Sequence, residues 1–233
     1  MEAIRIDKYI SVACGISRND AKALIRKGTV LINGKPAKKA DQKVSEADSI
    51  TVSGQKAVYK QYVYLVMNKP SGVLSASTDK RVKTVIDLVP EEFRHYDLFP
   101  VGRLDKDTTG LLLITNDGDF AHRVISPKSN TDKLYHAELD GRVTDEHIAV
   151  FEEGVVLADG TRCMPAELVA LDGFEALITI REGKYHQVKR MFGTVGLGVN
   201  KLKRLSIGAL ELPRELSEGS CRELSSEELS KLL

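Results

Sequence analysis

The sequence predicts an α+β protein of two domains, a small α/β domain followed by a larger domain with a mixed sheet. Three observations carry this prediction. Apolar residues recur at helical spacing over the first 28 residues, short β-rich runs follow, and from residue 62 strand and helix patterns occur without regular βαβ alternation. The length of 233 residues suits one small and one medium domain. We predict domains at residues 1–58 and 59–233, with a linker at about residues 53–61.

Composition and cysteine usage favour a globular protein of the cytoplasm. Hydrophobic residues make up 42% of the chain and charged residues 29%, which is ordinary for a protein with a real core. No apolar run approaches the roughly 20 residues that a membrane span needs, and the start of the chain lacks the apolar core of a secretory signal. The three cysteines lie far apart, without metal-ligand spacing or a disulfide framework, so we expect no metal site.

The charge is unevenly distributed along the chain. Residues 1–58 contain eleven Lys or Arg residues and six Asp or Glu residues, a net charge of +5. Because the whole chain carries +1, the remainder carries −4. A basic module joined to a mildly acidic one indicates that the first domain meets a polyanion.

The first domain reads as two helices and a small sheet. Apolar residues recur at helical spacing in residues 6–13, and Gly15 stops the pattern. Ser17 is a suitable N-cap for a second helix, which ends before Gly28. Strands are predicted at residues 30–32, near Val44 and at residues 50–52, with Asn33-Gly34 as a hairpin turn.

This segment resembles the S4 RNA-binding domain. The residues that carry the resemblance are Arg5-Ile6-Asp7-Lys8-Tyr9-Ile10, Ser17-Arg18, Ala21, Ile25, Gly28 and Val30 through Asn33-Gly34-Lys35. Cations on one helix face position a protein on RNA through its phosphates, without reading sequence. The candidates for such contacts are Arg5, Lys8, Arg18, Lys22, Arg26 and Lys27.

The second domain alternates irregularly between strand and helix patterns. Strands are predicted at residues 62–67, 111–115, 134–139, 166–171, 176–180 and 203–212. Helices are predicted near residues 84–88, 117–125, 145–153, 185–195 and 226–232. This order favours a mixed sheet rather than a doubly wound parallel one.

Four motifs lie at the loops of this domain. They are Gly102-Arg103-Leu104-Asp105 with Asp107-Thr108-Thr109-Gly110, Asn68-Lys69-Pro70-Ser71-Gly72, Lys133-Leu134-Tyr135, and Glu182-Gly183-Lys184-Tyr185-His186-Gln187-Val188-Lys189-Arg190-Met191. Each motif alone has an ordinary structural interpretation: an aspartate in a turn, a tyrosine on a sheet face, or cations on a solvated helix.

Together, and in this order, the four motifs resemble those of the pseudouridine synthases. With an S4-like domain in front, the chain is similar to the bacterial RsuA family, which modifies small-subunit (16S) ribosomal RNA. The segment His186-Gln187-Val188-Lys189 resembles the small-subunit branch, because large-subunit relatives tend to carry Asn-Arg and a second Arg there. A 23S target remains the alternative within the family.

The resemblance implies roles for three residues. Asp105 takes the position of the family's invariant aspartate, which adds to the uracil ring or acts at the sugar while the glycosidic bond breaks; the sequence does not choose between these. Lys189 takes the position of the basic residue that pairs with this aspartate, so we hypothesise a Lys189–Asp105 ion pair. Tyr135 takes the position of the tyrosine that stacks on the target base. Spacing alone leaves Asp107 as a competing nucleophile, and the motif favours Asp105.

The resemblance also offers RNA contacts in this domain. The uridine must be turned out of the RNA to reach the pocket, and Arg103 is the candidate to fill the vacated space or hold a phosphate. Lys69 is expected to support the active-site loop or to contact a phosphate, and Lys133 and Arg190 are further candidates for RNA contact.

The reaction is an isomerisation without redox change, so no cofactor is expected. The expected partner is ribosomal RNA, as 16S RNA or a small-subunit assembly intermediate, and we expect a monomer without membrane contact. One rival is a non-catalytic RNA-binding factor in ribosome assembly, but Asp105, Tyr135 and Lys189 are all intact. A nuclease or N-glycosidase is a further rival, and the sequence lacks the metal-binding acids, histidine pair or separated carboxylates that these enzymes use.

Overall fold

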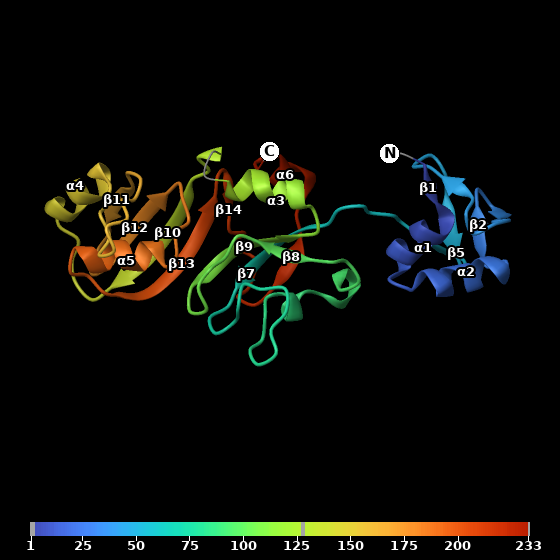
Figure 1. Ribbon diagram of the computed structural model, residues 1–233, viewed down its shortest axis with the longest axis horizontal. Helices are drawn as coiled ribbons and strands as arrows, with labels where there is room; N and C mark the ends of the chain where they lie inside the picture. The colour runs from blue at the N-terminus through green and yellow to red at the C-terminus, as the bar shows by residue number, and fades with distance from the viewer. Residues whose placement is uncertain (1–2, 127–128, 233) are drawn as a thin grey trace. The chain divides into compact units, whose positions relative to one another are not determined.

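The computed structural model describes residues 3–126 and 129–232, and the chain divides into two compact units (Figure 1). One unit comprises the residues up to Val63 together with Pro90–Asp97, and the other comprises Tyr64–Val89 and the chain from Leu98 onward. The expected linker at about residues 53–61 contains a short strand, β6 (Gln55–Lys56), which belongs to the first unit. The boundary at residue 58 remains a prediction.

The first unit packs two helices against short antiparallel strands. Its elements are β1 (Ile4–Arg5), α1 (Ile6–Cys14), α2 (Arg18–Arg26), β2 (Val30–Ile32), β3 (Lys35–Pro36), β4 (Lys43–Val44), β5 (Ile50–Val52), β6 and the 3-10 turn η2 (Glu91–Phe93). Four strands form a sheet in the order β3-β2-β5-β6, and β1 pairs with β4. The predicted helix ends are confirmed: Gly15 follows α1 in the left-handed conformation, and the Ser17 side chain accepts a hydrogen bond from Asp20 N.

The second unit contains a nine-stranded mixed sheet. The strands are β7 (Tyr64–Lys69), β8 (Phe99–Val101), β9 (Thr109–Thr115), β10 (Lys133–Leu139), β11 (Glu167–Ala170), β12 (Glu175–Ile180), β13 (Val199–Ile207), β14 (Leu210–Glu211) and β15 (Cys221–Glu223). The main order is β11-β12-β10-β13-β9-β7-β15, in which β13 and β9 run parallel and the other neighbours antiparallel. The prediction of a mixed sheet in an α+β domain is therefore confirmed.

The helices of this unit are short. They are η1 (Ile86–Leu88), α3 (Gly118–Ile125), α4 (Asp145–Glu153), α5 (Gln187–Thr194) and α6 (Ser226–Ser230). Asp117 caps α3 by accepting from Phe120 N, and Thr144 caps α4 by accepting from His147 N. Among the described residues no helix is both long and apolar enough to cross a membrane.

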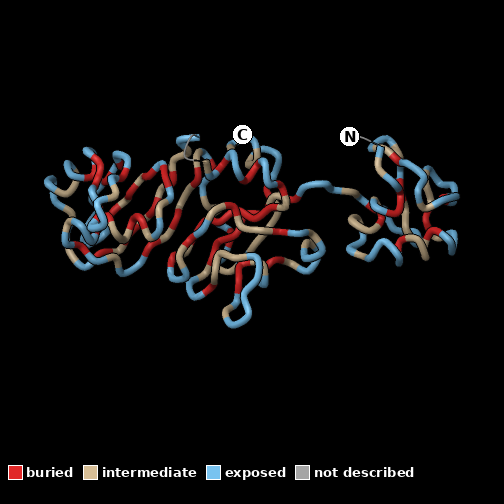
Figure 2. The backbone as a smooth tube through the Cα atoms, viewed as in Figure 1, coloured by how far each residue is buried: buried red, intermediate tan, exposed pale blue. Residues whose placement is uncertain are grey.

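The strand that follows the charged motif is buried on both faces. Leu111 and Leu113 of β9 pack in a core with Phe120 and Val124 of α3, and the intervening Leu112 and Ile114 are also fully buried. Figure 2 shows the run of buried residues along this part of the sheet. A strand held on both sides gives the preceding loop a rigid support.

Several predicted elements were wrong in extent or type. The strand predicted at residues 203–212 is a hairpin of β13 and β14 that turns at Gly208, whose φ is +54°, and β13 begins four residues earlier. The helix predicted near residues 84–88 is only the 3-10 turn η1. The helix predicted from residue 185 begins at Gln187, because His186 adopts the left-handed conformation. The short strands β1, β3, β6, β8 and β15 were not predicted.

Candidate active site

A small cavity of about 70 Å³ lies where four predicted motif residues meet. Its lining residues are Arg103, Leu104, Asp105 and Thr108 before β9, Tyr135 on β10, Ile180 at the end of β12 and Leu202 on β13. The last motif adds Gly183, Lys184 and the four residues from His186 to Lys189. The structure therefore brings together Asp105, Tyr135, Lys189 and Arg103, which lie up to 86 positions apart in the sequence. All of them belong to the second unit.

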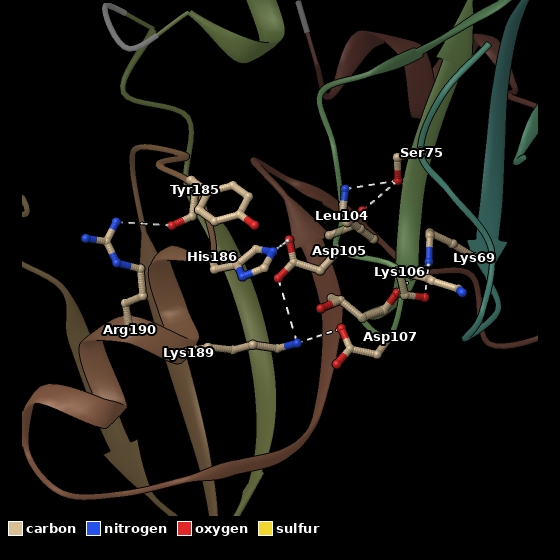
Figure 3. Close-up of polar contacts among 11 residues, drawn as sticks. Lys69, Ser75, Leu104, Asp105, Lys106, Asp107, Tyr185, His186, Lys189 and Arg190 are labelled. Carbon is tan, nitrogen blue, oxygen red and sulfur yellow. Dashed lines mark hydrogen bonds and ion pairs between the residues drawn. The ribbon is translucent and has the colours of Figure 1, made fainter. Parts of the chain in front are cut away.

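The loop that carries Asp105 is fastened through its main chain. The fully buried Lys69 at the end of β7 donates hydrogen bonds from Nζ to the carbonyl oxygens of Pro70, Lys106 and Thr108 at 3.1, 3.1 and 2.9 Å. On the other side, Ser75 Oγ donates to Leu104 O at 2.8 Å and accepts from Leu104 N at 3.1 Å. Figure 3 shows both anchors beside the loop. Lys69 thus supports the loop, and its ammonium does not reach out as a phosphate contact.

Two basic side chains of the last motif face Asp105 (Figure 3). His186 Nε2 lies 3.4 Å from Asp105 Oδ1, and Lys189 Nζ lies 3.8 Å from Asp105 Oδ2. The hydrogen bond of Lys189 goes to the neighbouring carboxylate, since Nζ lies 2.6 Å from Asp107 Oδ1. This hydrogen bond holds the pKa of Asp107 below its usual value. The hypothesised ion pair therefore exists at the limit of ion-pair distance, and the shorter contact is with the competing aspartate.

Tyr135 is held by an arginine that the sequence analysis missed. Arg204 of β13 stands opposite Tyr135 in the antiparallel pair of β10 and β13, so both side chains share a face of the sheet. Arg204 donates from Nε to Leu111 O at 2.8 Å and from Nη1 to the Tyr135 hydroxyl at 3.4 Å. Both residues are buried, with exposed fractions of 3% and 7%. Arg204 thus connects the strand behind the Asp105 loop to the tyrosine ring.

The residues predicted to contact RNA near the site divide into two groups. Arg103 is exposed and lines the cavity. Lys133 is instead buried and donates from Nζ to Thr131 O, and burial lowers its pKa. Arg190 is occupied by an ion pair with Asp159 at 2.5 Å. Both cations therefore have partners within the protein, and their contact with RNA stays a prediction.

In the first unit, the predicted cations lie mostly at the surface. Lys8, Arg26 and Lys27 are exposed, and Lys22 and Arg26 line a groove with Lys38 and Lys39. The two lysines after β3 were not among the predicted contacts, because they follow the helices in sequence and only the fold brings them alongside α2.

Arg5 and Arg18 are organised by a buried acid. The side chain of Asp7 is fully buried, and its Oδ2 lies 3.0 Å from Arg5 Nη2 and 2.9 Å from Arg18 Nη2. About half of each arginine side chain remains exposed. Asp7 therefore holds two guanidinium groups near the starts of α1 and α2.

Comparison with known proteins shows the family of both units. A family model described as RNA pseudouridylate synthase matches residues 63–194, and one described as S4 domain matches residues 4–50. The chain is similar to "Uncharacterized RNA pseudouridine synthase YtzG" of Bacillus subtilis (44% identity, 98% of both chains). It is also similar to "Ribosomal small subunit pseudouridine synthase A" of Pasteurella multocida (37%, 97% of this chain and 98% of the relative) and "Ribosomal large subunit pseudouridine synthase B" of B. subtilis (39%, 98% and 95%).

A solved structure supports the same assignment over the full length. The chain matches a "Crystal structure of pseudouridylate synthase" with a TM-score of 0.70 and 36% identity, covering 99% of this chain and 100% of the other. The aspartate loop, the buried tyrosine and the basic helix start lie together in the segment that the synthase model matches. The chain, an S4 domain followed by a catalytic domain, belongs to the RsuA family of RNA pseudouridine synthases and is an enzyme.

Proposed function

We propose that the enzyme converts one uridine of 16S ribosomal RNA into pseudouridine, with Asp105 as the catalytic group. The observation that carries the proposal is the Asp105 carboxylate, 26% exposed, at a cavity that also contains Tyr135, His186 and Lys189. The small-subunit substrate is supported by relatives named small subunit synthase A at 36–37% identity and by the His-Gln-Val-Lys segment. The ribosomal substrate also supports a cytoplasmic location.

The proposed reaction exchanges one bond of the uridine for another. The bond between ribose C1′ and uracil N1 breaks, the base rotates, and C1′ joins uracil C5. The proton on C5 leaves and N1 gains a proton, so the product is an isomer of the substrate. Asp105 either adds to C6 of the ring or acts at the sugar, and it must be ionised in both cases. No electron is gained or lost, so the proposal includes no cofactor.

Two basic residues lie beside Asp105. Lys189 and His186 approach from one side of the cavity at 3.8 and 3.4 Å. A cation at such a distance offsets part of the desolvation that a bound base imposes on a carboxylate. Asp107 takes the short hydrogen bond of Lys189, which leaves Asp105 the less engaged acid and the better placed one for reaction.

Tyr135 is proposed to stack on the base and to relay the C5 proton, its oxygen taking that proton while its own O–H proton passes on to water. Its ring lines the cavity, and its hydroxyl oxygen accepts a hydrogen bond from Arg204. A stacked uridine cannot enter a cavity of this kind, so base flipping is part of the proposal, with exposed Arg103 beside the vacated position. The basic groove of the first unit supports a second contact with the same RNA.

The proposal is tested by mapping pseudouridine across 16S and 23S RNA in cells that lack the gene. One 16S signal should be missing, and wild type should restore it whereas Asp105→Asn should not. An Asp119→Asn variant, on the exposed first turn of α3, serves as the matched control and should restore the signal. If no signal is missing in either RNA, the enzymatic proposal fails for ribosomal RNA.

A 23S uridine is the second candidate substrate. The observation that favours it is the relative named large subunit synthase B, at 39% identity over nearly the full chain. The same mapping experiment separates the two, because the missing signal lies in only one of the two RNAs. A loss confined to 23S RNA would replace the 16S assignment and leave the chemistry at Asp105 unchanged.

A further inference from the structure

An exposed aromatic ring stands beside the proposed active site. Tyr185 is 71% exposed, more than any other large apolar or aromatic residue that the structure describes as exposed. It lies in the loop between β12 and α5 and does not line the cavity, although its neighbours Lys184 and His186 do. A partner that covers a ring of this size would recover the hydrophobic free energy that its exposure costs.

The ring is one layer of a stack that leads to Asp105. The Tyr185 and His186 rings are stacked, with centroids 3.8 Å apart and planes inclined by 17°. His186 Nε2 in turn lies 3.4 Å from Asp105 Oδ1. Figure 3 shows the two rings together to the left of the Asp105 carboxylate. One face of Tyr185 is covered by His186, and its outer face remains open next to the position where the target base would react.

The loop that presents Tyr185 is held rigidly from below. Gln187 is buried; its Oε1 accepts from Lys184 N at 2.9 Å, and its Nε2 donates to Glu182 Oε1 at 2.7 Å. The same Glu182 oxygen accepts from Met164 N at 2.8 Å. These contacts tie both ends of the loop to the interior and hold the exposed tip in one place.

The backbone at the tip is in an unfavourable conformation. His186 has φ of 47° and ψ of 36°, a left-handed conformation that is uncommon in residues other than glycine and costs them free energy. Arg190 Nη1 donates to Tyr185 O at 3.4 Å and supports this turn. The strain and the supports both serve to place two stacked rings at the mouth of the cavity.

The surroundings indicate what covers the open face. The exposed Arg103 lines the same cavity, where it would attract a phosphate of an RNA chain, while Lys184 and Lys189 there are paired with Glu182 and Asp107. Aromatic rings next to cations bind unpaired nucleobases by stacking while the cations meet the phosphates. We propose that the outer face of Tyr185 is a stacking site for an unpaired nucleobase that neighbours the target uridine. This inference rests on the proposed function and extends its substrate to a locally single-stranded RNA segment.

Fluorescence gives a direct test, because the chain contains no tryptophan. A Tyr185→Trp variant of the full chain carries a single indole at the proposed stacking site. We expect its emission to be quenched by a mixed-sequence single-stranded 12-mer RNA, and much less by the same sequence as a duplex. A matched control is Phe174→Trp, which places the indole at a 51% exposed aromatic position between β11 and β12. Its emission should not respond to either RNA.

Kinetics give an independent test on ribosomal RNA as substrate. Removing one base–aromatic stack changes affinity by about 5- to 150-fold. We therefore expect Tyr185→Ala to raise KM by roughly tenfold or more and to leave kcat within about twofold, whereas Tyr185→Phe should behave as wild type. A KM effect without a kcat effect is not expected from a loss of loop structure, because His186 would then be displaced from Asp105.

The outcomes separate this inference from the proposed function. If wild type forms pseudouridine, but the Tyr185→Trp variant is not quenched and Tyr185→Ala keeps the wild-type KM, the stacking site is wrong and the function stands. Equal quenching by duplex and single strand, or equal losses in the Ala and Phe variants, also overturns it. If wild type forms no pseudouridine and quenching by single-stranded RNA persists, the function fails and the stacking site survives.

Discussion

Gly110 and Arg204 approach each other through their main chains, at the point where strands β9 and β13 pair in parallel. A Cβ atom on Gly110 would lie 2.2 Å from the Arg204 carbonyl oxygen, and Gly110 has φ of +98°. A real Cβ never comes so close to a backbone atom, so only glycine allows β13 to lie against the end of the Asp105 loop. The loop that carries Asp105 and the strand that carries Arg204, the hydrogen-bond partner of Tyr135, meet at this contact.

Gly110→Ala should therefore destabilise the protein strongly. The substitution adds a backbone clash and an unfavourable φ, and we expect a loss of more than about 2 kcal/mol in the free energy of unfolding. Urea titration measures this loss. Gly118→Ala at the start of α3 is the control, since no atom lies within 4 Å of its added Cβ, and it should change stability by less than about 0.5 kcal/mol. Similar midpoints for the two variants would contradict the prediction.

The two aspartates of the loop should differ sharply in activity. Asp105→Asn should reduce turnover by about a thousandfold or more, because an amide neither adds to the base nor accepts its proton. Asp107→Asn should reduce turnover by less than about tenfold, because it removes only the 2.6 Å partner of Lys189. Release of tritium from C5-labelled uridine in ribosomal RNA measures both. A reversed order would transfer the catalytic role to Asp107.

Burial lowers the pKa of Lys69 from 10.5 to about 8, against the opposing charges of Asp107, Asp105 and Glu218. Between pH 8 and 10.5 the folded chain has lost this proton while the unfolded chain retains it, so the residue's contribution to the free energy of unfolding rises with pH. Activity, in contrast, should fall as the pH rises through this range. The neutral amine donates only two hydrogen bonds to three carbonyls, and the Asp105 loop loses an anchor.

We therefore expect turnover to fall with a midpoint near pH 8. Glu218→Gln should shift the midpoint to lower pH, because the Glu218 charge raises the pKa of Lys69. Ionisation of the RNA itself would not respond to this change. Glu211→Gln on β14 is the control for a general charge effect and should leave the midpoint in place. An unchanged midpoint in Glu218→Gln would disconnect Lys69 from the pH profile.

Arg204 should act as a positioning residue through Tyr135. Arg204→Lys retains the charge but cannot keep both hydrogen bonds, to Leu111 O and to the Tyr135 hydroxyl. We expect roughly a tenfold loss in kcat with little change in KM, and almost no further effect of Arg204→Lys in a Tyr135→Phe background. Fully additive losses would show that Arg204 acts independently of the tyrosine. Arg142→Lys, at an exposed position, controls for the chemical change.

Asp7 should make the first unit sensitive to acid. Burial acts to raise the pKa of Asp7, but hydrogen bonds from Arg5 and Arg18 outweigh it and hold the pKa below 3.8. Its contribution to stability is therefore complete above pH 3.8 and is lost as the pH falls through the folded-state value. Asp7→Asn should flatten this acid limb in unfolding measurements between pH 5 and 2.5, and the exposed Asp97→Asn should not.

The sequence was sufficient to predict the structure wherever neighbouring residues alone determine the backbone conformation. Gly15 and Ser17 end and begin helices through backbone conformation and capping, which depend on neighbouring residues. The apolar run at residues 111–115 was likewise predicted as a strand from its own residues, and it forms most of the buried strand β9. Asp105, Tyr135 and Lys189 could be placed together because their motifs matched a known family, since no spacing rule connects residues so far apart.

The remaining features depend on tertiary contacts that spacing does not encode. Arg204 reads as a surface cation in its strand, and only the register between β10 and β13 places it against Tyr135. Lys133 reads as an RNA contact, although its position on the same face buries it. The preference of Lys189 for Asp107 over Asp105 is a difference of 1.2 Å between two contacts, from 2.6 to 3.8 Å, which a motif cannot specify.

The side chains of Ser75 and Lys69 hydrogen-bond to main-chain groups of Leu104, Lys106 and Thr108, and these bonds do not involve the side chains of the loop. Position 106 is exposed and does not line the cavity, so its side chain can vary without loss of these main-chain hydrogen bonds. Diversifying this position in a library would be a practical route to enzymes that accept different RNA targets while keeping the same chemistry.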